Sequence, residues 1–224
     1  FHNPLTVAEN YAMVDLLSKG RLTLGLGSGY LKHEFEGYQI DPATKRDRFD
    51  ENLHLVPRLL RGERVTYEGK YTSLDAVKLN VLPHQAEVPI YVAILRKEAA
   101  YHVGKQGNRI LFVPYASVDN FDEIGELMSE FRRGREEAGY SDHADAAGIC
   151  LHTHVAPSDA EARQTAADCF DLYVATRLYA KSANYDDVIK SGLSLFGSVE
   201  TVAAKLMQLH QMGVDHVLTL QNFG

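Results

Sequence analysis

The sequence is poor in the features that mark several protein classes. It has 2 cysteines, Cys150 and Cys169, which are too few for a disulfide scaffold and suit a reduced, cytoplasmic setting. No run of Lys and Arg exceeds two residues and the formal net charge is -7, so we expect no nucleic-acid partner. No apolar run approaches the roughly 18 residues of a membrane span, and no signal-peptide layout opens the chain. These absences leave an ordinary soluble globular protein, with 45% hydrophobic and 24% charged residues.

What the sequence does contain is an alternation of helices and apolar strands. Apolar residues at helical spacing predict helices, and short apolar runs predict strands. Gly20 signals the end of the first helix, Pro57 predicts a kink or break in the second, and Ser158 with Glu161 forms a capping box. The predicted helices are 4–18, 44–61, 96–106, 120–138, one after Ser158, and 198–212; the predicted strands are 21–27, 89–94, 109–115, 148–156 and 215–223, with a hairpin over 65–74.

This order of elements predicts an α/β fold with a parallel sheet. Strands that alternate with helices of this length form βαβ units, and continuous apolar strands are buried on both faces. Five main strands and one peripheral hairpin are fewer than the eight strands, on about 250 residues, of a complete barrel. The residues alone therefore leave two alternatives, an open sheet or an incomplete TIM barrel. No repeat or linker interrupts the chain, so we expect a single domain over residues 1–224.

The stretch RLTLGLGSGY, Arg21 to Tyr30, places glycines at alternate positions behind a strand, as a dinucleotide-binding turn does. The third glycine of the pattern GxGxxG would have to be residue 30, which is Tyr30. The acidic ribose ligand expected about 20 residues later would fall in a segment that predicts a helix. We therefore reject the dinucleotide interpretation.

A longer pattern surrounds this stretch, from His2 to the glycine turn. The segment resembles the bacterial-luciferase-like flavin-dependent monooxygenases, and the later elements follow in the order of that family. The residues that carry the resemblance are His2, Pro4, Ala8-Glu9, Val14-Asp15, Leu17-Ser18-Lys19-Gly20-Arg21 and Gly25 to Gly29.

The resemblance implies a luciferase-like TIM barrel of which this chain holds roughly strands 4 to 8. The segment from His2 follows the third strand in that family, so roughly 80 residues with three strands would be missing, as would a last helix. Phe1 in place of Met agrees with a chain that starts inside a gene product. A naturally shorter fold is the alternative.

The cofactor-binding candidates lie after two strands. Gly27, Ser28 and Gly29 end one strand at the face where barrel sites are built, and glycine lets a planar ring approach the backbone. The family implies that this ring is a flavin, although luciferase has Cys-Arg-Gly there and any role of that thiol does not carry over. The alternative is a tight strand-to-helix turn.

Arg96, Lys97 and Glu98 open the helix after the next strand, where the family binds the flavin phosphate. A helix N-terminus attracts anions, and Arg offers a bidentate fork to phosphate oxygens. The family often has Ser, Thr or Gly in this turn, so the donors here would partly differ. A solvated, charged helix start is the alternative.

His2 is the catalytic candidate, because a histidine at a barrel mouth acts as acid or base near neutral pH; a structural turn residue is the alternative. The candidates for the substrate and lid region are Tyr30, His152, Arg177 and Gln221. His152 and His154 have the HxH spacing of some metal-binding barrels, but further ligands are lacking, so we predict no metal and favour structural histidines. Tyr173 and Arg177 are equally well explained as a helix packing face.

The resemblance implies a flavin-dependent monooxygenase that uses reduced FMN and O2 to oxygenate a small organic substrate. A separate flavin reductase would supply the reduced cofactor, since no NAD(P) motif is present, and the family commonly forms homodimers. Two alternatives stay open. The deazaflavin F420 would make the protein a hydride-transfer oxidoreductase, and a non-catalytic flavin-binding or structural relative belongs to another class. The substrate is not predicted.

Overall fold

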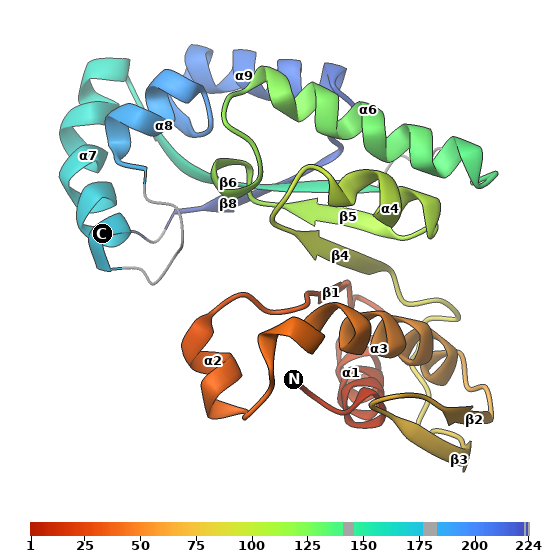
Figure 1. The fold of residues 1–224 in the computed structure, drawn as a ribbon. Helices are drawn as coiled ribbons and strands as arrows, with labels where there is room; N and C mark the ends of the chain where they lie inside the picture. Colours follow the sequence, from red (N-terminus) through yellow and green to blue (C-terminus); the bar gives the residue numbers. More distant parts are fainter. Residues whose placement is uncertain (141–145, 177–182, 222, 224) are drawn as a thin grey trace. The chain divides into compact units, whose positions relative to one another are not determined.

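The computed structural model describes residues 1–140, 146–176, 183–221 and 223 (Figure 1). It divides into two compact units, Phe1–Tyr91 and Val92–Gly224. The single domain over residues 1–224 stays a prediction.

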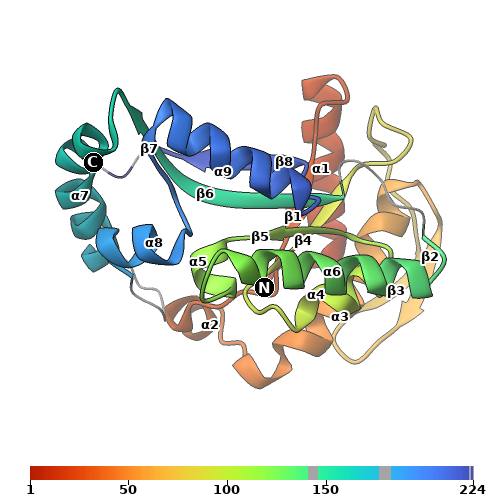
Figure 2. The ribbon, with the colours of Figure 1, turned by 90° about the horizontal axis from the view of Figure 1, so that it is seen from above.

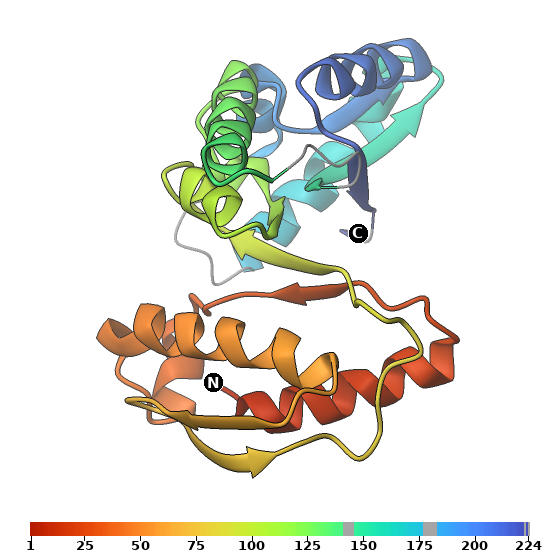
Figure 3. The same ribbon diagram turned by 90° about the vertical axis from the view of Figure 1, so that its right-hand side faces the viewer.

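The first unit packs two helices against each other and against a small hairpin (Figure 3). Its core is formed by apolar residues of α1, β1, α3 and the hairpin, including Ala8, Leu24, Leu55 and Val65. β4 (Ile90–Ile94) begins in this unit, where the Leu24 N–H donates to the Pro89 carbonyl just before it at 2.9 Å. The other elements are α1 (Pro4–Ser18), β1 (Leu24–Leu26), α2 (Lys32–Gly37), the 3₁₀ helix η1 (Pro42–Thr44), α3 (Lys45–Leu60), β2 (Val65–Glu68) and β3 (Ser73–Val77).

The ends of α1 follow from local chemistry. The Asn3 side chain accepts the Leu5 N–H at 2.9 Å, and Pro4 takes the first helical position, where its missing N–H costs nothing. Two left-handed residues, Lys19 (φ 58°) and Gly20 (φ 77°), stop the helix. The predicted helix over residues 4–18 is confirmed.

Pro57, at which a kink or a break was predicted, does not break the helix α3. The helix continues through Pro57 to Leu60. Leu55, Val56 and Leu59 are buried at 0 to 1% exposure on either side of the proline, and this packing outweighs the hydrogen bond that proline cannot donate.

One carboxylate connects α3 to the hairpin turn. The Glu51 side chain accepts the backbone N–H groups of Lys70, Tyr71 and Thr72 at 2.8, 3.1 and 3.1 Å. The same turn is closed by Gly69 N–H donating to the Thr72 carbonyl at 2.9 Å. The predicted hairpin is therefore confirmed, and a side chain distant in sequence holds its turn.

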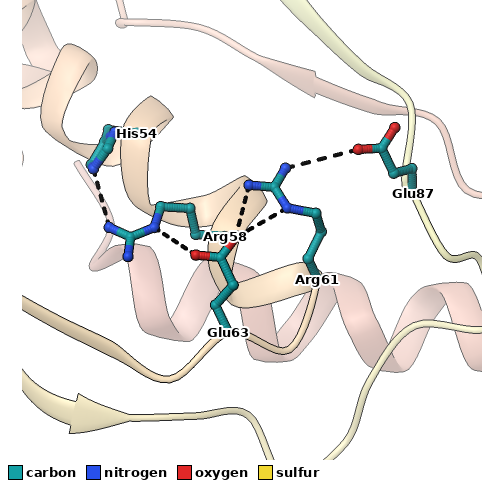
Figure 4. A network of polar contacts seen from close by, with 5 residues as sticks. All are labelled: His54, Arg58, Arg61, Glu63 and Glu87. Atoms are coloured by element: carbon teal, nitrogen blue, oxygen red, sulfur yellow. Dashed lines mark hydrogen bonds and ion pairs between the residues drawn. The ribbon is translucent and has the colours of Figure 1, made fainter.

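A second polar network closes the carboxyl end of α3 (Figure 4). Glu63 accepts hydrogen bonds from Arg58 Nε at 2.8 Å and from Arg61 Nη2 at 2.9 Å, and Arg58 also contacts His54 Nε2 at 3.2 Å. The hydrogen bond from Arg58, reinforced by Arg61, lowers the pKa of the Glu63 carboxyl. The Arg61 Nη1 also lies 3.9 Å from the Glu87 Oε1. The Arg61 guanidinium therefore lies between the carboxylates of Glu63 and Glu87.

The second unit is built on parallel strands with helices between them. Its elements are the rest of β4, α4 (Ala99–Lys105), β5 (Arg109–Phe112), α5 (Pro114–Ser117), α6 (Asp122–Glu137), β6 (Ala147–Ala156), α7 (Asp159–Thr176), α8 (Tyr185–Ser191), β7 (Leu195–Ser198), α9 (Val199–Gln211) and β8 (His216–Leu220).

The strand β6 is the centre of this sheet (Figure 2). It pairs in parallel with β5, with β8 over residues 148–152, and with β7 over residues 153–156. The parallel pairs and the alternation of strands with helices confirm the predicted α/β class. β7 was not predicted, because its four residues run directly into the Ser198 cap of α9 with no turn signal between them.

Glycines set the contact between α4 and α6. A Cβ on Gly104 would overlap the Phe131 carbonyl oxygen, and a Cβ on Gly134 would overlap that of Tyr101. The two helices therefore pack backbone against backbone.

Within the described residues, no helix combines the length and apolar composition needed to cross a membrane.

Candidate active site

The predicted site residues fall into two groups, one in each unit. His2 and the turn Gly27 to Tyr30 belong to the first unit, whereas Arg96 to Glu98, His152 and Gln221 belong to the second. Arg177 lies outside the described residues.

The glycine turn follows β1 directly, as predicted. Gly29 has φ +80°, in the left-handed region that favours glycine. A Cβ at this position would lie 2.6 Å from Cζ of Phe1 and 3.4 Å from Cζ of Phe35. The turn thus accepts an aromatic ring against its backbone, and in this structure the ring is that of Phe1.

His2 lies in the same aromatic cluster. Its ring lies nearly perpendicular to that of Tyr38 at a centroid distance of 5.5 Å, and the Phe1 ring stacks on that of Tyr38 at 5.0 Å. The His2 carbonyl accepts a hydrogen bond from Asn52 Nδ2 at 3.2 Å. The structure therefore brings His2 and the glycine turn together around Phe1, with the His2 side chain exposed.

The connection after β4 is a turn rather than the start of a helix. The N–H groups of Ala99 and Ala100 donate to the carbonyls of Arg96 and Lys97, both at 3.1 Å, and α4 begins at Ala99. The predicted start at residue 96 is wrong, because these two turns precede the first helical residue. Arg96 and Glu98 are exposed.

Lys97 makes ion pairs with α6. Its ammonium lies 3.1 Å from Glu123 Oε2 and 3.6 Å from Glu126 Oε2. The hydrogen bond to Glu123, which outweighs the opposing effect of desolvation, raises the pKa of Lys97. The ammonium is therefore directed to α6, and Arg96 is the residue of this turn that a phosphate would reach from solvent.

His152 occupies the centre of a second aromatic cluster. It is the last β6 residue paired with β8, opposite Leu220, at the carboxyl end of that pair. The imidazole is 2% exposed. Among the described residues, the rings of Tyr115, Phe170, Tyr173 and Phe223 lie around it at centroid distances of 5.0 to 6.1 Å.

This cluster gathers residues from the ends of several elements. Tyr115 comes from the connection after β5, Phe170 and Tyr173 from α7, and Phe223 from the segment after β8. The His152 Nε2 lies 3.5 Å from the Tyr173 hydroxyl. The arrangement provides a buried, aromatic environment with one imidazole and two phenols, and the imidazole and the Tyr173 phenol lie close enough to share a proton at the ends of parallel strands.

His154, two residues further along β6, has a different environment. Its Nε2 contacts the Thr165 Oγ1 at 2.7 Å, and its ring is partly exposed. Within the described part of the chain, no group of three or more His, Cys, Asp or Glu side chains could hold a metal ion.

Two further candidates lie near the strand ends. Tyr30 is 43% exposed in the first unit. Gln221 follows β8 in the second unit and donates through Nε2 to the Thr219 Oγ1 at 3.3 Å.

Neither Tyr115 nor Phe223 was predicted as a site residue, and Tyr173 was predicted only as part of a helix packing face. Tyr115 ends the predicted strand over residues 109–115. Position at a strand end, which was used to select Arg96, would also have selected Tyr115. Tyr173 could not be found in this way, because it lies within α7 and reaches His152 only through tertiary packing.

Comparison with known proteins identifies a family. The family model described as luciferase-like monooxygenase matches residues 1–216. The uncharacterized protein y4wF of Sinorhizobium fredii is 29% identical over 238 residues, covering 99% of this chain and 68% of that protein. Limonene 1,2-monooxygenase of Rhodococcus erythropolis is 26% identical, covering 94% of this chain and 57% of that enzyme. An F420-dependent glucose-6-phosphate dehydrogenase of Kineococcus radiotolerans is 32% identical over 141 residues, covering 62% of this chain and 41% of that enzyme.

Solved structures share the fold. The monooxygenase RslO1 of Streptomyces bottropensis superimposes with a TM-score of 0.85 at 26% identity, covering 99% of this chain and 67% of that one. The oxygenating constituent of 3,6-diketocamphane monooxygenase of Pseudomonas putida, in complex with FMN, superimposes with a TM-score of 0.79 at 17% identity. The match covers 98% of this chain and 70% of that one. The chain therefore has the α/β fold of a luciferase-like TIM barrel, in incomplete form. It spans 68% or less of the length of the three curated relatives.

Proposed function

Because the chain belongs to the luciferase-like monooxygenase family, we propose that it is a flavin-dependent monooxygenase that oxygenates a small organic substrate with reduced FMN and O2. The observation that carries the proposal is the family match over residues 1–216, supported by relatives that are monooxygenases or other oxidoreductases. Reduced flavin, when bound, supplies the electrons for oxygen activation, and the protein supplies binding and orientation.

Arg96 is the proposed contact to the cofactor phosphate. It is exposed at the carboxyl end of β4, and its guanidinium can offer two parallel N–H donors to phosphate oxygens. Lys97 contributes indirectly, because its ion pairs with Glu123 and Glu126 tie the turn to α6.

The glycine turn is the proposed contact to a ring of the cofactor. Gly29 already accepts the Phe1 ring in a position that a Cβ would fill, so its backbone fits a planar group. Cysteine is absent from Gly27-Ser28-Gly29, and no thiol chemistry is proposed.

Proton handling is assigned to two histidines, each considered within its own unit. His2 is exposed and stays the candidate acid or base of the first unit. In the second unit, His152 and Tyr173 can share a proton inside a ring of aromatic side chains that excludes water from the strand ends.

A titration with two cofactors tests the proposal. We expect FMN to bind the protein with a change in its visible absorbance, and F420 to bind more weakly. With a separate NADH-dependent flavin reductase present, the H2O2 formed per O2 consumed should fall when a substrate is added, because reduced flavin alone passes its electrons to O2 and gives H2O2. Binding of F420 without FMN would overturn the monooxygenase proposal, and binding of neither would indicate a non-catalytic relative.

The second candidate function is F420-dependent hydride transfer. It is favoured by the 32% identity to an F420-dependent glucose-6-phosphate dehydrogenase, although that match covers 62% of this chain. A hydride-transfer enzyme would reduce F420 anaerobically, whereas a monooxygenase would require O2, so the two are separated by assays with and without oxygen.

Two partners belong to the proposal. A separate flavin reductase would supply reduced FMN; NADH alone should then leave FMN oxidised in the presence of this protein. A second copy of the chain would form a homodimer.

A further inference from the structure

The outer face of α1 is more apolar than the face that the helix buries. The buried residues are small or polar, namely Pro4, Ala8, Ala12 and Asp15. Four large apolar side chains are exposed instead: Met13 at 53%, Val14 at 44%, Leu16 at 42% and Leu17 at 81%. A helix on the surface of a globular protein normally has the opposite arrangement, and a helix that is apolar on all sides is normally buried. The exposed face of α1 therefore indicates an interaction surface.

The packing of the first unit fixes this face on the outside. α3 packs against α1 (Figure 3), and Ala8 and Ala12 belong to the core that the two helices share. On the same side of α1, the Asp15 carboxylate accepts the backbone N–H groups of Leu22 at 3.2 Å and Gln85 at 2.8 Å. A rotation of α1 that turned its large side chains inward would break these contacts.

We call Met13, Val14, Leu16 and Leu17 the outer patch of α1. Leu17 is the most exposed large apolar residue in the part of the chain that the structure describes. Met13 lies four positions before Leu17 and Val14 three, so the three side chains form one stripe along the helix. A stripe with this spacing is the surface through which one helix packs on another. The shape of the outer patch thus fits a helix as its partner.

Charge selects which helix this is. Glu9 and Lys19 are exposed at the two ends of the outer patch, and neither forms an ion pair within the described residues. Glu9 lies five positions before Val14, and Lys19 lies five positions after it. If two copies of α1 pair in opposite directions about Val14, each Glu9 lies opposite the Lys19 of the other copy. A two-fold axis produces this arrangement, because it brings the same surface of both copies together.

We propose that the outer patch of α1 is the interface between two copies of this chain, with α1 paired in opposite directions and a Glu9–Lys19 ion pair at each end. The apolar patch provides the affinity, because its removal from water drives association. The exposed ion pairs contribute little affinity and fix the direction of pairing. The inference rests on the proposed homodimer and names the face through which the two copies meet.

A pair of leucine substitutions locates the interface. Leu17→Lys places a charge in the outer patch of both copies, and we expect it to weaken dimerisation of the full chain by about 100-fold or more. Leu172→Lys is the matched control, because Leu172 is a 67% exposed leucine of another helix, α7. It should leave the dissociation constant within about two-fold of the wild type. Sedimentation measures the association, and circular dichroism should show that both variants are folded.

Two charge reversals test the direction of pairing. Glu9→Lys and Lys19→Glu each place like charges at both ends of the interface, so each variant alone should dimerise about ten-fold or more weakly at low ionic strength. A mixture of the two variants should instead form a heterodimer, because each ion pair then joins opposite charges. The double variant should recover the dimer for the same reason. Native mass spectrometry distinguishes these species.

The outcomes separate the interface from the proposed homodimer. A chain that is monomeric over the micromolar range would overturn both, and would mean that a different partner covers α1. A dimer that persists in Leu17→Lys, or charge-reversed variants that show no preference for the heterodimer, would overturn the α1 interface and leave the homodimer standing. The FMN titration tests the proposed activity independently of all these results.

Discussion

Asp15 is fully buried, and its carboxylate is nevertheless stabilised in the charged form. Burial alone would raise its pKa, but the backbone and side-chain N–H groups of Gln85, each at 2.8 Å, and the Leu22 N–H at 3.2 Å lower it below the ordinary 3.8. The residue joins the end of α1 to two loops of the first unit and has a structural role.

Replacing this carboxylate should destabilise the first unit. Asp15→Asn keeps the shape but turns an NH2 group toward buried donors, so we expect the free energy of unfolding to fall by about 3 kcal/mol. Urea denaturation followed by circular dichroism measures the loss. Glu9→Gln, an exposed change in the same helix, should stay within about 0.5 kcal/mol, and an equal effect of both would contradict the assigned role.

The same carboxylate predicts a pH dependence. Its folded-state pKa is lowered, so its stabilisation is present above the ordinary value of 3.8 and is lost as the pH falls through the folded-state pKa. The difference in stability between the wild type and Asp15→Asn should be constant from about pH 7 to pH 5 and shrink below about pH 4. A difference that grows with acidity would show that the sign is wrong.

Arg96 allows a test of the phosphate contact. Arg96→Ala should weaken FMN binding by about 10- to 100-fold, because a charge-assisted hydrogen bond contributes about 1.5–3 kcal/mol. Riboflavin, which lacks the phosphate, should bind the variant and the wild type equally. Arg133→Ala, which breaks ion pairs on the surface of α6, is the control. An equal loss for FMN and riboflavin would place Arg96 elsewhere in the site.

At the scale of single residues, the sequence predicts positions better than partners. Gly29 and Arg96 were predicted to follow strand ends, and the structure places them after β1 and β4; their roles stay predictions. The pairing of Lys97 with Glu123 and the rings around His152 were not predicted, because they join residues distant in sequence through packing.

At the scale of elements, the contact between α4 and α6 depends on two glycines. Gly104→Ala would place a methyl group against the Phe131 carbonyl oxygen and 3.2 Å from the Arg135 nitrogen. The two helices would have to separate, and we expect a loss of about 1–3 kcal/mol in the free energy of unfolding.

A glycine in the same helix pair provides the control. Gly125 lies in α6 with Met212 Cγ at 3.7 Å as the nearest atom to an added Cβ. Gly125→Ala should therefore be neutral or stabilise by up to about 1 kcal/mol through helix propensity. Thermal denaturation compares the variants, and equal effects would show that helix packing is not the cause.

The hairpin of the first unit should depend on Glu51. Glu51→Gln replaces one acceptor oxygen by an NH2 group opposite three backbone donors, and we expect a loss of about 1–2 kcal/mol. Hydrogen exchange at Lys70 to Thr72 should accelerate. Asp50→Asn removes the same charge from an exposed ion pair with Arg46 and should change neither quantity appreciably.

Helix starts were predictable where a cap marks them. Ser198 accepts the Thr201 N–H at 3.2 Å and Ser158 accepts the Glu161 N–H at 3.2 Å, as their spacing predicts. The start of α4 was placed too early, because Glu98 makes no side-chain cap and nothing in the sequence separates turn from helix.

At the scale of the whole molecule, the predicted number of main strands was one too low, because the sheet of the described residues has six strands. The five predicted main strands correspond to β1, β4, β5, β6 and β8, and the added β7 extends the pairing of β6. The strand pattern alone did not distinguish an open sheet from an incomplete barrel, and the family resemblance predicted the barrel. The net charge and the composition could not predict which cofactor the protein binds.

Homodimer formation is the prediction at this scale. A 25.0 kDa chain that pairs with a second copy should scatter light as a particle of twice that mass, independent of ionic strength if the interface is apolar. A monomer over the micromolar range would contradict the proposal.

The turn that ends α1 has a wider consequence. Ser18, Gly20 and Arg21 serve the backbone there: Gly20 has a positive φ, the Gly20 N–H donates to the Asp15 carbonyl at 2.9 Å, and Arg21 Nε donates to the Ser18 carbonyl at 2.7 Å. These residues of the family pattern therefore stabilise the turn at the end of α1, and this role does not depend on which cofactor or substrate the protein binds. A search with them recovers the ancestry of a protein but cannot sort FMN enzymes from F420 enzymes. That distinction has to be sought at the strand ends, where Arg96 and Tyr115 lie.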